Sequence, residues 1–162
     1  MKGGMDVSPI LPKHQMSEED IKLQYITPSI TSKWSRDKIT METRITDGKI
    51  NLKGNFVFRE KPKRADYILY LNANNPIAIV EAKDNTHNVS HGLQQAMTYA
   101  RMLDVPFAYS SNGDGFAEHD FITGQEREFS LDEFPTEHEL IARYKQESGL
   151  TLPQETVLEQ PY

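Results

Sequence analysis

Two short apolar segments separated by four turn-forming residues are the strongest structural signal in this chain. Residues 66–71 (DYILYL) and 76–83 (PIAIVEAK) are rich in isoleucine and other strand-forming side chains, and residues 72–75 (NANN) lie between them. β-Branched and aromatic side chains favour strands, whereas asparagine favours turns. The pattern therefore predicts a β-hairpin, and its apolar flanks favour a central place in a sheet.

The expected register of this hairpin brings two carboxylates together. If residues 72–75 form the turn, Leu71 lies opposite Pro76, and Asp66 lies opposite Glu81. The Cβ atoms of such a pair are about 4.5–5.5 Å apart. Two bare carboxylates at about 5 Å repel each other by about 3 kcal/mol at an effective dielectric constant near 20. Folding alone gives no reason for this arrangement, whereas a divalent cation between the carboxylates would make it favourable.

Lys83 completes a set of side chains suited to phosphodiester hydrolysis. Strand alternation puts Lys83 on the same face as Glu81, while Ala78, Val80 and Ala82 face the core. A metal ion held by two carboxylates polarises a phosphate and lowers the pKa of an attacking water. A lysine can orient that water or stabilise developing negative charge. The competing interpretation is a surface ion pair at the end of a hairpin, which an isolated spacing of this kind usually represents.

The rest of the chain predicts an α/β fold with a mixed sheet. Ser17 followed by three acidic residues predicts a helix start, and Pro28 predicts a bend in that helix. We further expect one or two strands between residues 38 and 58, a helix with a core-facing apolar stripe over 88–103, strands at 106–110 and 115–121, and a short polar helix over 137–146.

Charge is distributed unevenly along the chain. The formal net charge is −6, but residues 33–64 carry ten basic and four acidic residues, a net charge of +6, and residues 114–162 have a net charge of −9. The basic segment would attract a polyanion, although basic side chains also decorate ordinary solvated strands. The chain has no cysteine and no run of 18 apolar residues, so we expect no disulfide, no cysteine-ligated zinc, no membrane span and a cytoplasmic location.

Several short motifs, taken in order, resemble one family. Asp66 followed by Glu81-Ala82-Lys83 resembles the PD-(D/E)xK nuclease signature, with alanine in place of the proline, and residues 95–99 are similar to the Q-x-x-x-Y extension of one branch. Further similar stretches extend the likeness over roughly residues 17–125. Together the motifs look like the N-terminal nuclease domain of the restriction (motor) subunit of type I restriction–modification enzymes.

The resemblance implies a restriction-endonuclease-like mixed sheet flanked by helices, and Mg²⁺-dependent cleavage of double-stranded DNA, with Mn²⁺ as a substitute. It implies that Asp66 and Glu81 ligate the metal together with the backbone carbonyl of Ala82. Lys83 would be the catalytic lysine. Glu18 is a further candidate metal ligand, directly or through water.

Other residues would support this site. The neighbours of Glu18 in the first helix, Glu19 and Asp20, are alternatives to it as the metal-binding acid. The residues expected to contact DNA or support the active-site loop are Gln95, Tyr99, Lys61, Lys63 and Arg64.

The resemblance also predicts how the chain is divided. We expect a flexible N-terminal arm at 1–16, the endonuclease domain at 17–147, and a linker at 148–162 toward a motor domain that this chain lacks. ATP would serve only that motor, since no G-x-x-x-x-G-K-[ST] motif is present. The expected partners are double-stranded DNA and the methyltransferase and specificity subunits of a restriction complex, without a membrane. A stand-alone repair or transposition nuclease of the same fold and a catalytically inert DNA-binding or subunit-docking module are the alternatives.

Overall fold

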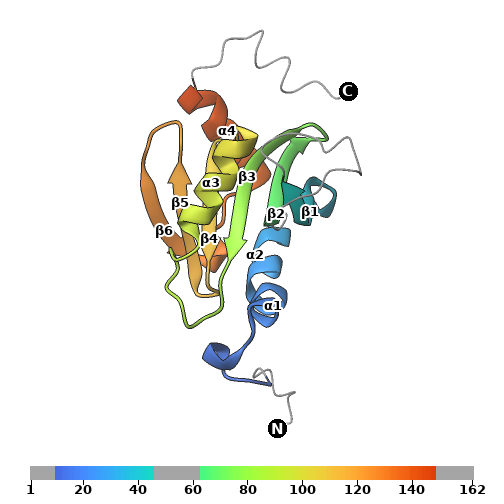
Figure 1. Ribbon diagram of the computed structural model, residues 1–162. Coiled ribbons are helices and arrows are strands. Elements are labelled where there is room, and N and C mark those ends of the chain that lie inside the picture. Colours follow the sequence, from blue (N-terminus) through green and yellow to red (C-terminus); the bar gives the residue numbers. More distant parts are fainter. Residues whose placement is uncertain (1–9, 46–62, 149–162) are drawn as a thin grey trace, which may run out of the picture.

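The computed structural model describes residues 10–45 and 63–148 (Figure 1). In chain order its elements are η1 (Lys13–Gln15), α1 (Glu18–Ile21), η2 (Lys22–Ile26), α2 (Thr27–Thr31), η3 (Arg36–Lys38), β1 (Ile39–Ile45), β2 (Lys63–Asn72), β3 (Asn75–Ala82), α3 (Leu93–Leu103), β4 (Phe107–Ser111), β5 (Gly115–Asp120), β6 (Glu126–Ser130), η4 (Leu131–Glu133) and α4 (Glu137–Ser148). Of the strands expected between residues 38 and 58, β1 is found, and the remainder of that range lies outside the described residues.

The six described strands form one mixed sheet in sequence order, β1-β2-β3-β4-β5-β6. β3 and β4 are parallel, and all other neighbouring strands are antiparallel. A parallel pair needs a long crossover connection, which α3 supplies here. The predicted α/β class with a mixed sheet is therefore confirmed.

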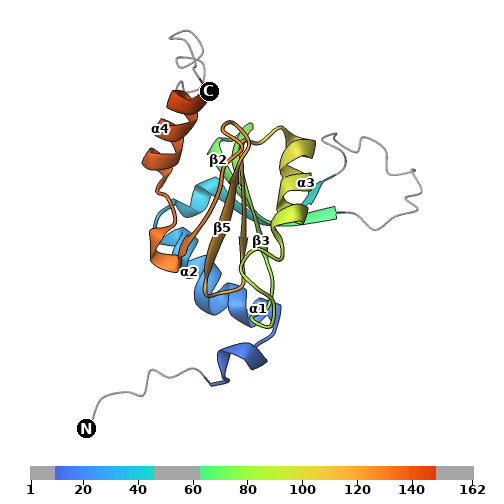
Figure 2. The same ribbon diagram turned by 90° about the vertical axis from the view of Figure 1, so that its left-hand side faces the viewer.

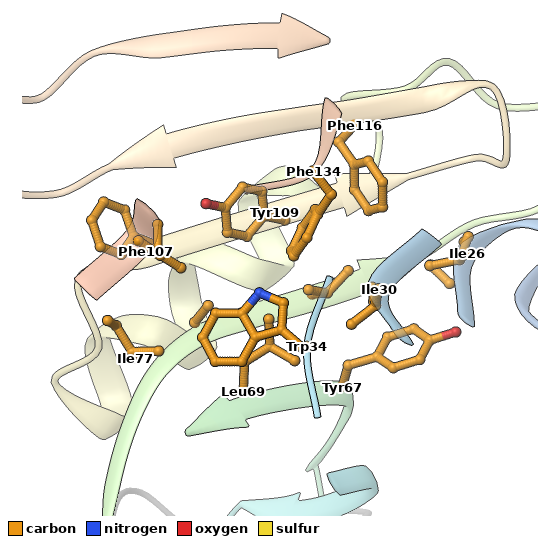
Figure 3. Packing of buried hydrophobic residues seen from close by; sticks show 14 of the residues in the cluster. Ile26, Ile30, Trp34, Tyr67, Leu69, Ile77, Phe107, Tyr109, Phe116 and Phe134 are labelled. Carbon is orange, nitrogen blue, oxygen red and sulfur yellow. The ribbon is translucent and has the colours of Figure 1, made fainter. Parts of the chain in front are cut away.

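Helices cover both faces of this sheet (Figure 2). The helical segment α1-η2-α2, called the first helix below, lies with α4 on one face, and α3 lies on the other. Figure 3 shows the core under the first helix, where Ile26, Ile30 and Trp34 pack close to Tyr67 and Leu69. A second apolar core lies between α3 and the opposite face. The hairpin of β2 and β3 is thus central, as its apolar flanks predicted.

The register of this hairpin agrees with the sequence, but its turn does not. Tyr67 pairs with Val80, as the predicted register requires. Asn72 and Asn75 also pair, so the turn has two residues between the strands instead of four. Two shifts in pairing, on either side of Tyr70, offset each other. The far end of the hairpin, where the carboxylates lie, therefore keeps the expected register.

The first helix begins and changes its winding as local side-chain chemistry predicts. Ser17 and Asp20 form a capping box, each side chain accepting a hydrogen bond from the backbone N–H of the other residue. Pro28, where a bend or break was expected, lies in the first turn of α2, which directly follows the π-helical segment η2. π-Helical turns are uncommon within helices and change the direction in which the following side chains point.

The prediction for α3 was wrong at its start. The apolar stripe predicted a helix from residue 88, whereas α3 begins at Leu93. The N–H groups of His91 and Leu93 donate to carbonyls three residues earlier, those of Asn88 and Ser90. Such bonds form turns and leave the preceding residues in a loop between β3 and α3.

The segments expected as an arm and a linker are only partly described. Residues 1–9 lie outside the described residues, but η1 has a defined place and Met16 is buried. The ammonium of Lys13 lies 2.9 Å from the carboxylate of Asp114. At the other end, α4 extends to Ser148, and residues 149–162 lie outside the described residues. No helix in the described ranges is long and apolar enough to cross a membrane.

Candidate active site

Three carboxylates form a row across the first three strands of the sheet. Met41 pairs with Tyr67 and Thr43 with Ala65, so the register of the two strands brings Glu42 of β1 beside Asp66 of β2. The hairpin register places Asp66 opposite Glu81 of β3. Directly opposed like charges destabilise a sheet. A row of three acids is therefore a feature that folding alone does not favour.

Backbone N–H groups hold the carboxylates of Asp66 and Glu81 in place. Oε2 of Glu81 accepts a hydrogen bond from the N–H of Asp66 at 2.8 Å. Oδ2 of Asp66 accepts one from the N–H of Ala82 at 2.7 Å. Each carboxylate is thus fixed against the neighbouring strand, which keeps the two acids side by side.

Burial and neighbouring carboxylates raise the pKa values of both groups. Burial, followed by the nearby charge of Asp66, raises the pKa of Glu81 to about 8. Burial also raises the pKa of Asp66, although the N–H of Ala82 and the ammonium of Lys22 act in the opposite direction. Without an added cation, the site therefore holds a proton at neutral pH that a metal ion would displace.

The raised pKa of Glu81 predicts how stability depends on pH. Its pKa exceeds the ordinary value of 4.5, so the folded chain binds the proton more tightly than the unfolded chain. The stabilisation is complete below pH 4.5 and is lost as the pH rises through about 8. With a chelator present, we expect the free energy of unfolding to fall between pH 5 and pH 9 by at least about 2 kcal/mol more in the wild type than in Glu81→Gln. Urea unfolding at both pH values measures this difference, and equal pH dependence in the two proteins would contradict it.

A buried lysine lies at the end of the row. The Lys22 side chain is 2% exposed, and its ammonium lies 2.7 Å from Glu42, 3.2 Å from Glu19 and 3.5 Å from Asp66. Burial by itself lowers the pKa of Lys22, but these three carboxylates together raise it above the ordinary value. Lys22 therefore stays charged and lies beside the Glu42 end of the carboxylate row.

Glu42 reaches this lysine from an unusual backbone conformation. Its φ angle is 53°, in the left-handed region that residues with a side chain seldom adopt. The hydrogen bond from Lys22 lowers the pKa of Glu42, which keeps this carboxylate charged. Residues in such conformations gather at functional sites, where the surrounding structure compensates a strain of about 1–3 kcal/mol.

Glu18 is the acid of the first helix that faces the central carboxylates. Burial and the charge of Asp66 raise the pKa of Glu18, and the charge of Lys83 lowers it, so its carboxyl group lies within electrostatic reach of both residues. Asp20 is used by the helix cap, and Glu19 is paired with Lys22. Of the three candidates left open by the sequence, Glu18 is the one that interacts electrostatically with both Asp66 and Lys83 and is used neither by the helix cap nor by Lys22.

The start of α3 packs directly against the site. The N–H of Gly92 donates to Oγ of Ser110 at 3.0 Å. A Cβ atom at Gly92 would lie 2.9 Å from this oxygen, 3.4 Å from the Lys83 side chain and 3.5 Å from Cβ of Glu81. Glycine thus permits a close approach that confines both functional side chains.

α3 also contributes the predicted glutamine–tyrosine pair. Nε2 of Gln95 donates to the hydroxyl of Tyr99 at 2.6 Å. Burial raises the pKa of Tyr99, with smaller effects in the same direction from Glu81 and Asp66. The phenol therefore lies within electrostatic reach of the carboxylates.

Of the remaining predicted residues, Lys63 and Arg64 lie at the edge of the candidate site. Lys63 and Arg64 are exposed at the start of β2, two to three residues before Asp66. Lys61 lies outside the described residues. Lys22 and Glu42 were missed by sequence reasoning. The signal available for Lys22 is its position four residues after Glu18 on the same helical side, whereas no pattern marks Glu42.

Asp66 and Glu81 could together bind a divalent cation whose remaining ligands come from other groups. Within residues 10–45 and 63–148, no group of three or more histidine, aspartate or glutamate side chains is arranged to hold a metal ion alone. Asp66 and Glu81 are two hard oxygen donors whose pKa values rise because they are buried together. These are the ligands that Mg²⁺ uses, with the remaining positions filled by water, carbonyls or phosphate. The carbonyl of Ala82, which directly follows Glu81, and the carboxylate of Glu18 are candidates for such positions.

Comparison with known proteins points to one group. Residues 38–105 match the family of the second domain of the type I restriction enzyme EcoKI endonuclease subunit. The chain is 36% identical over 153 residues to the type I restriction enzyme EcoAI endonuclease subunit of Escherichia coli, an alignment that covers 91% of this chain and 19% of that protein. A solved fragment described as an HsdR subunit of a type I restriction enzyme from Vibrio vulnificus YJ016 superposes with a TM-score of 0.76 and 38% identity, over 91% of this chain and 29% of that one. The chain thus spans about a fifth of the curated relative.

Proposed function

We propose that the chain is the Mg²⁺-dependent endonuclease domain of a restriction (R) subunit of a type I restriction enzyme, cleaving phosphodiester bonds of double-stranded DNA; its likeness to the endonuclease subunits of such enzymes supports this. The observation that carries this proposal is the pair of opposed, half-buried or buried carboxylates, Asp66 and Glu81, followed on the same face by Lys83. Two ionised acids in this arrangement repel each other, and a divalent cation bound between them would replace that repulsion with attraction.

Each residue of the site has a distinct proposed role. Asp66 and Glu81 would hold Mg²⁺, with the carbonyl of Ala82 and the carboxylate of Glu18 as further ligands, directly or through water. When bound, the ion would polarise the phosphate and lower the pKa of an attacking water. Lys83 would place its ammonium beside the reacting phosphate, where it orients the water or neutralises developing negative charge.

Residues around the carboxylates would position the DNA. Lys63 and Arg64 are exposed beside the site and would contact phosphates, which fixes the position of a duplex without reading its sequence. Gln95 and Tyr99 would support the active-site side of α3. Targeting would come from the methyltransferase and specificity subunits, and ATP-driven translocation from a motor outside this chain, in a cytoplasmic complex. Lys61 would join the phosphate contacts but lies outside the described residues.

An inert DNA-binding or docking module is the main alternative, in which the acids no longer bind metal. The hydrogen bonds that fix Asp66 and Glu81 against each other support the nuclease instead, because a module without metal gains nothing from holding two acids in contact. A stand-alone nuclease of the same fold would use the same residues and would differ only in its targeting.

Metal binding tests the proposal directly. We expect calorimetric titration of this chain with Mn²⁺ to show a bound ion, and Asp66→Asn to weaken its affinity by at least about a hundredfold, since a carboxylate ligand is lost. Glu128→Gln on the distant, exposed strand β6 is the matched control and should bind Mn²⁺ as the wild type does. An inert module predicts no binding that depends on Asp66, and equal affinities for the wild type and Asp66→Asn would overturn the assignment.

A further inference from the structure

The buried ammonium of Lys22 carries a further inference about how many metal ions the site accepts. We propose that Lys22 permanently fills the position that a second divalent ion would occupy, so that the site takes a single divalent ion. This inference rests on the proposed function, because it concerns the same carboxylates. It assigns Lys22 as a positioning residue of the nuclease site.

The contacts of Asp66 divide the carboxylate row into two sides. Toward β3, Oδ2 of Asp66 accepts the N–H of Ala82, and Glu81 lies directly opposite. Toward β1, Oδ1 of Asp66 lies 3.5 Å from the Lys22 ammonium, which also contacts Glu42. A carboxylate that bridges two cations is the usual centre of a two-ion site. Here one of the two cations is part of the chain.

Three carboxylates make the position of the Lys22 ammonium favourable for a cation. Glu42, Glu19 and Asp66 surround the ammonium at 2.7, 3.2 and 3.5 Å. Carboxylate oxygens are also ligands that a divalent ion uses. Because the ammonium already holds these oxygens, a second ion could bind there only by displacing it.

Lys22 is held so that displacement is unfavourable. It stands directly after α1, whose start is fixed by the capping box of Ser17 and Asp20, and the preceding Ile21 is fully buried. Its side chain is 2% exposed, and its ammonium lies 5.8 Å from the centre of the Tyr67 ring. Moving the ammonium away would part it from the three carboxylates that now hold it, of which Asp66 is mostly buried while Glu19 and Glu42 are 75% and 49% exposed.

The left-handed backbone of Glu42 fits the same role. The strained conformation brings a carboxylate from the edge strand β1 onto the lysine, and nothing in the pairing of β1 with β2 requires it. Strained residues are common at functional sites, where surrounding contacts hold them in place. The contact in question is the ion pair with Lys22.

The number of Mn²⁺ ions bound per chain tests this inference. We expect one ion for the wild type and for Lys22→Arg, which keeps a cation in place, and two ions for Lys22→Met, which has a similar length without the charge. Lys38→Met is the control, because Lys38 forms an ion pair with Glu137 away from the site. Calorimetry gives the stoichiometry, and the electron paramagnetic resonance of bound Mn²⁺ shows whether two ions are close enough to couple.

The outcomes separate this inference from the proposed function. Two ions on the wild-type chain, or a single ion on a folded Lys22→Met chain, would overturn the role of Lys22 while leaving the nuclease proposal standing. No Asp66-dependent ion on the wild type would remove the proposed function and this inference with it. If Lys22→Met does not fold, two ions on the wild type or on Lys22→Arg would still overturn the inference, which requires one ion on both.

Discussion

Replacement of Lys83 with methionine is expected to lower the rate of DNA cleavage about a hundredfold to a thousandfold, the range seen when one preorganised donor at a reacting centre is removed. Mn²⁺ binding should persist, because Asp66 and Glu81 remain and are held by backbone N–H groups that the substitution does not touch. The loss would therefore arise in the chemical step and not in the loss of the metal ion.

The measurement is the nicking of supercoiled plasmid DNA with Mn²⁺, together with a Mn²⁺ titration of the same protein. Lys33→Met is the matched control, because Lys33 is also half-buried but donates to the carbonyl of Asp132, away from the carboxylates. A Lys83→Met protein that nicks plasmid at the wild-type rate would exclude Lys83 from catalysis. Loss of both nicking and Mn²⁺ binding would assign it to the metal site instead.

The central hairpin could be predicted from the sequence because its determinants are local. Alternation of side chains and the turn residues fix which positions face each other, and one face is filled with apolar groups. This is why the register opposite Asp66 was correct although the turn proved to be two residues long, with compensating shifts in pairing. The capping box at Ser17 was predictable for the same reason, since the residues that form it are three apart.

Elements without an apolar pattern were not predictable. β6 was missed because its residues are mostly polar and exposed, with only Phe129 partly buried, so nothing in the sequence distinguishes this edge strand from a loop. The predicted start of α3 was too early because Val89 continues the apolar spacing of the helix. The turns that precede Leu93 are formed by hydrogen bonds between backbone groups, which sequence patterns do not show.

The candidate site was predictable only in its central part. Asp66, Glu81 and Lys83 lie within one hairpin, so spacing is enough to place them together. Lys22 and Glu42 reach the same point from the first helix and from β1, and their contact joins residues twenty positions apart. The positive φ of Glu42 also interrupts the normal strand geometry. No local pattern encodes that contact, which depends on how the helix packs across the edge of the sheet.

A second large effect is expected far from the carboxylate row, where Arg143 attaches α4 to the sheet. Its guanidinium contacts both oxygens of Glu118, at 2.9 and 3.1 Å, and lies 3.1 Å from Asp120. Glu118 is 2% exposed and is also contacted by Arg127 and the hydroxyl of Tyr109. These contacts lower the pKa of Glu118 despite its burial, so it remains charged.

Arg143→Met should therefore lower the free energy of unfolding by about 3–5 kcal/mol, because it leaves a buried carboxylate without its main partner. Urea unfolding measures the loss, and Arg36→Met, a change of an exposed arginine, should alter stability by less than about 0.5 kcal/mol. The double variant Arg143→Met, Glu118→Gln should recover part of the loss, since the stranded charge is removed with its partner. A loss below about 1 kcal/mol for Arg143→Met would instead mean that apolar contacts such as those of the buried Leu140 hold α4 in place and that the ion pairs only select its position.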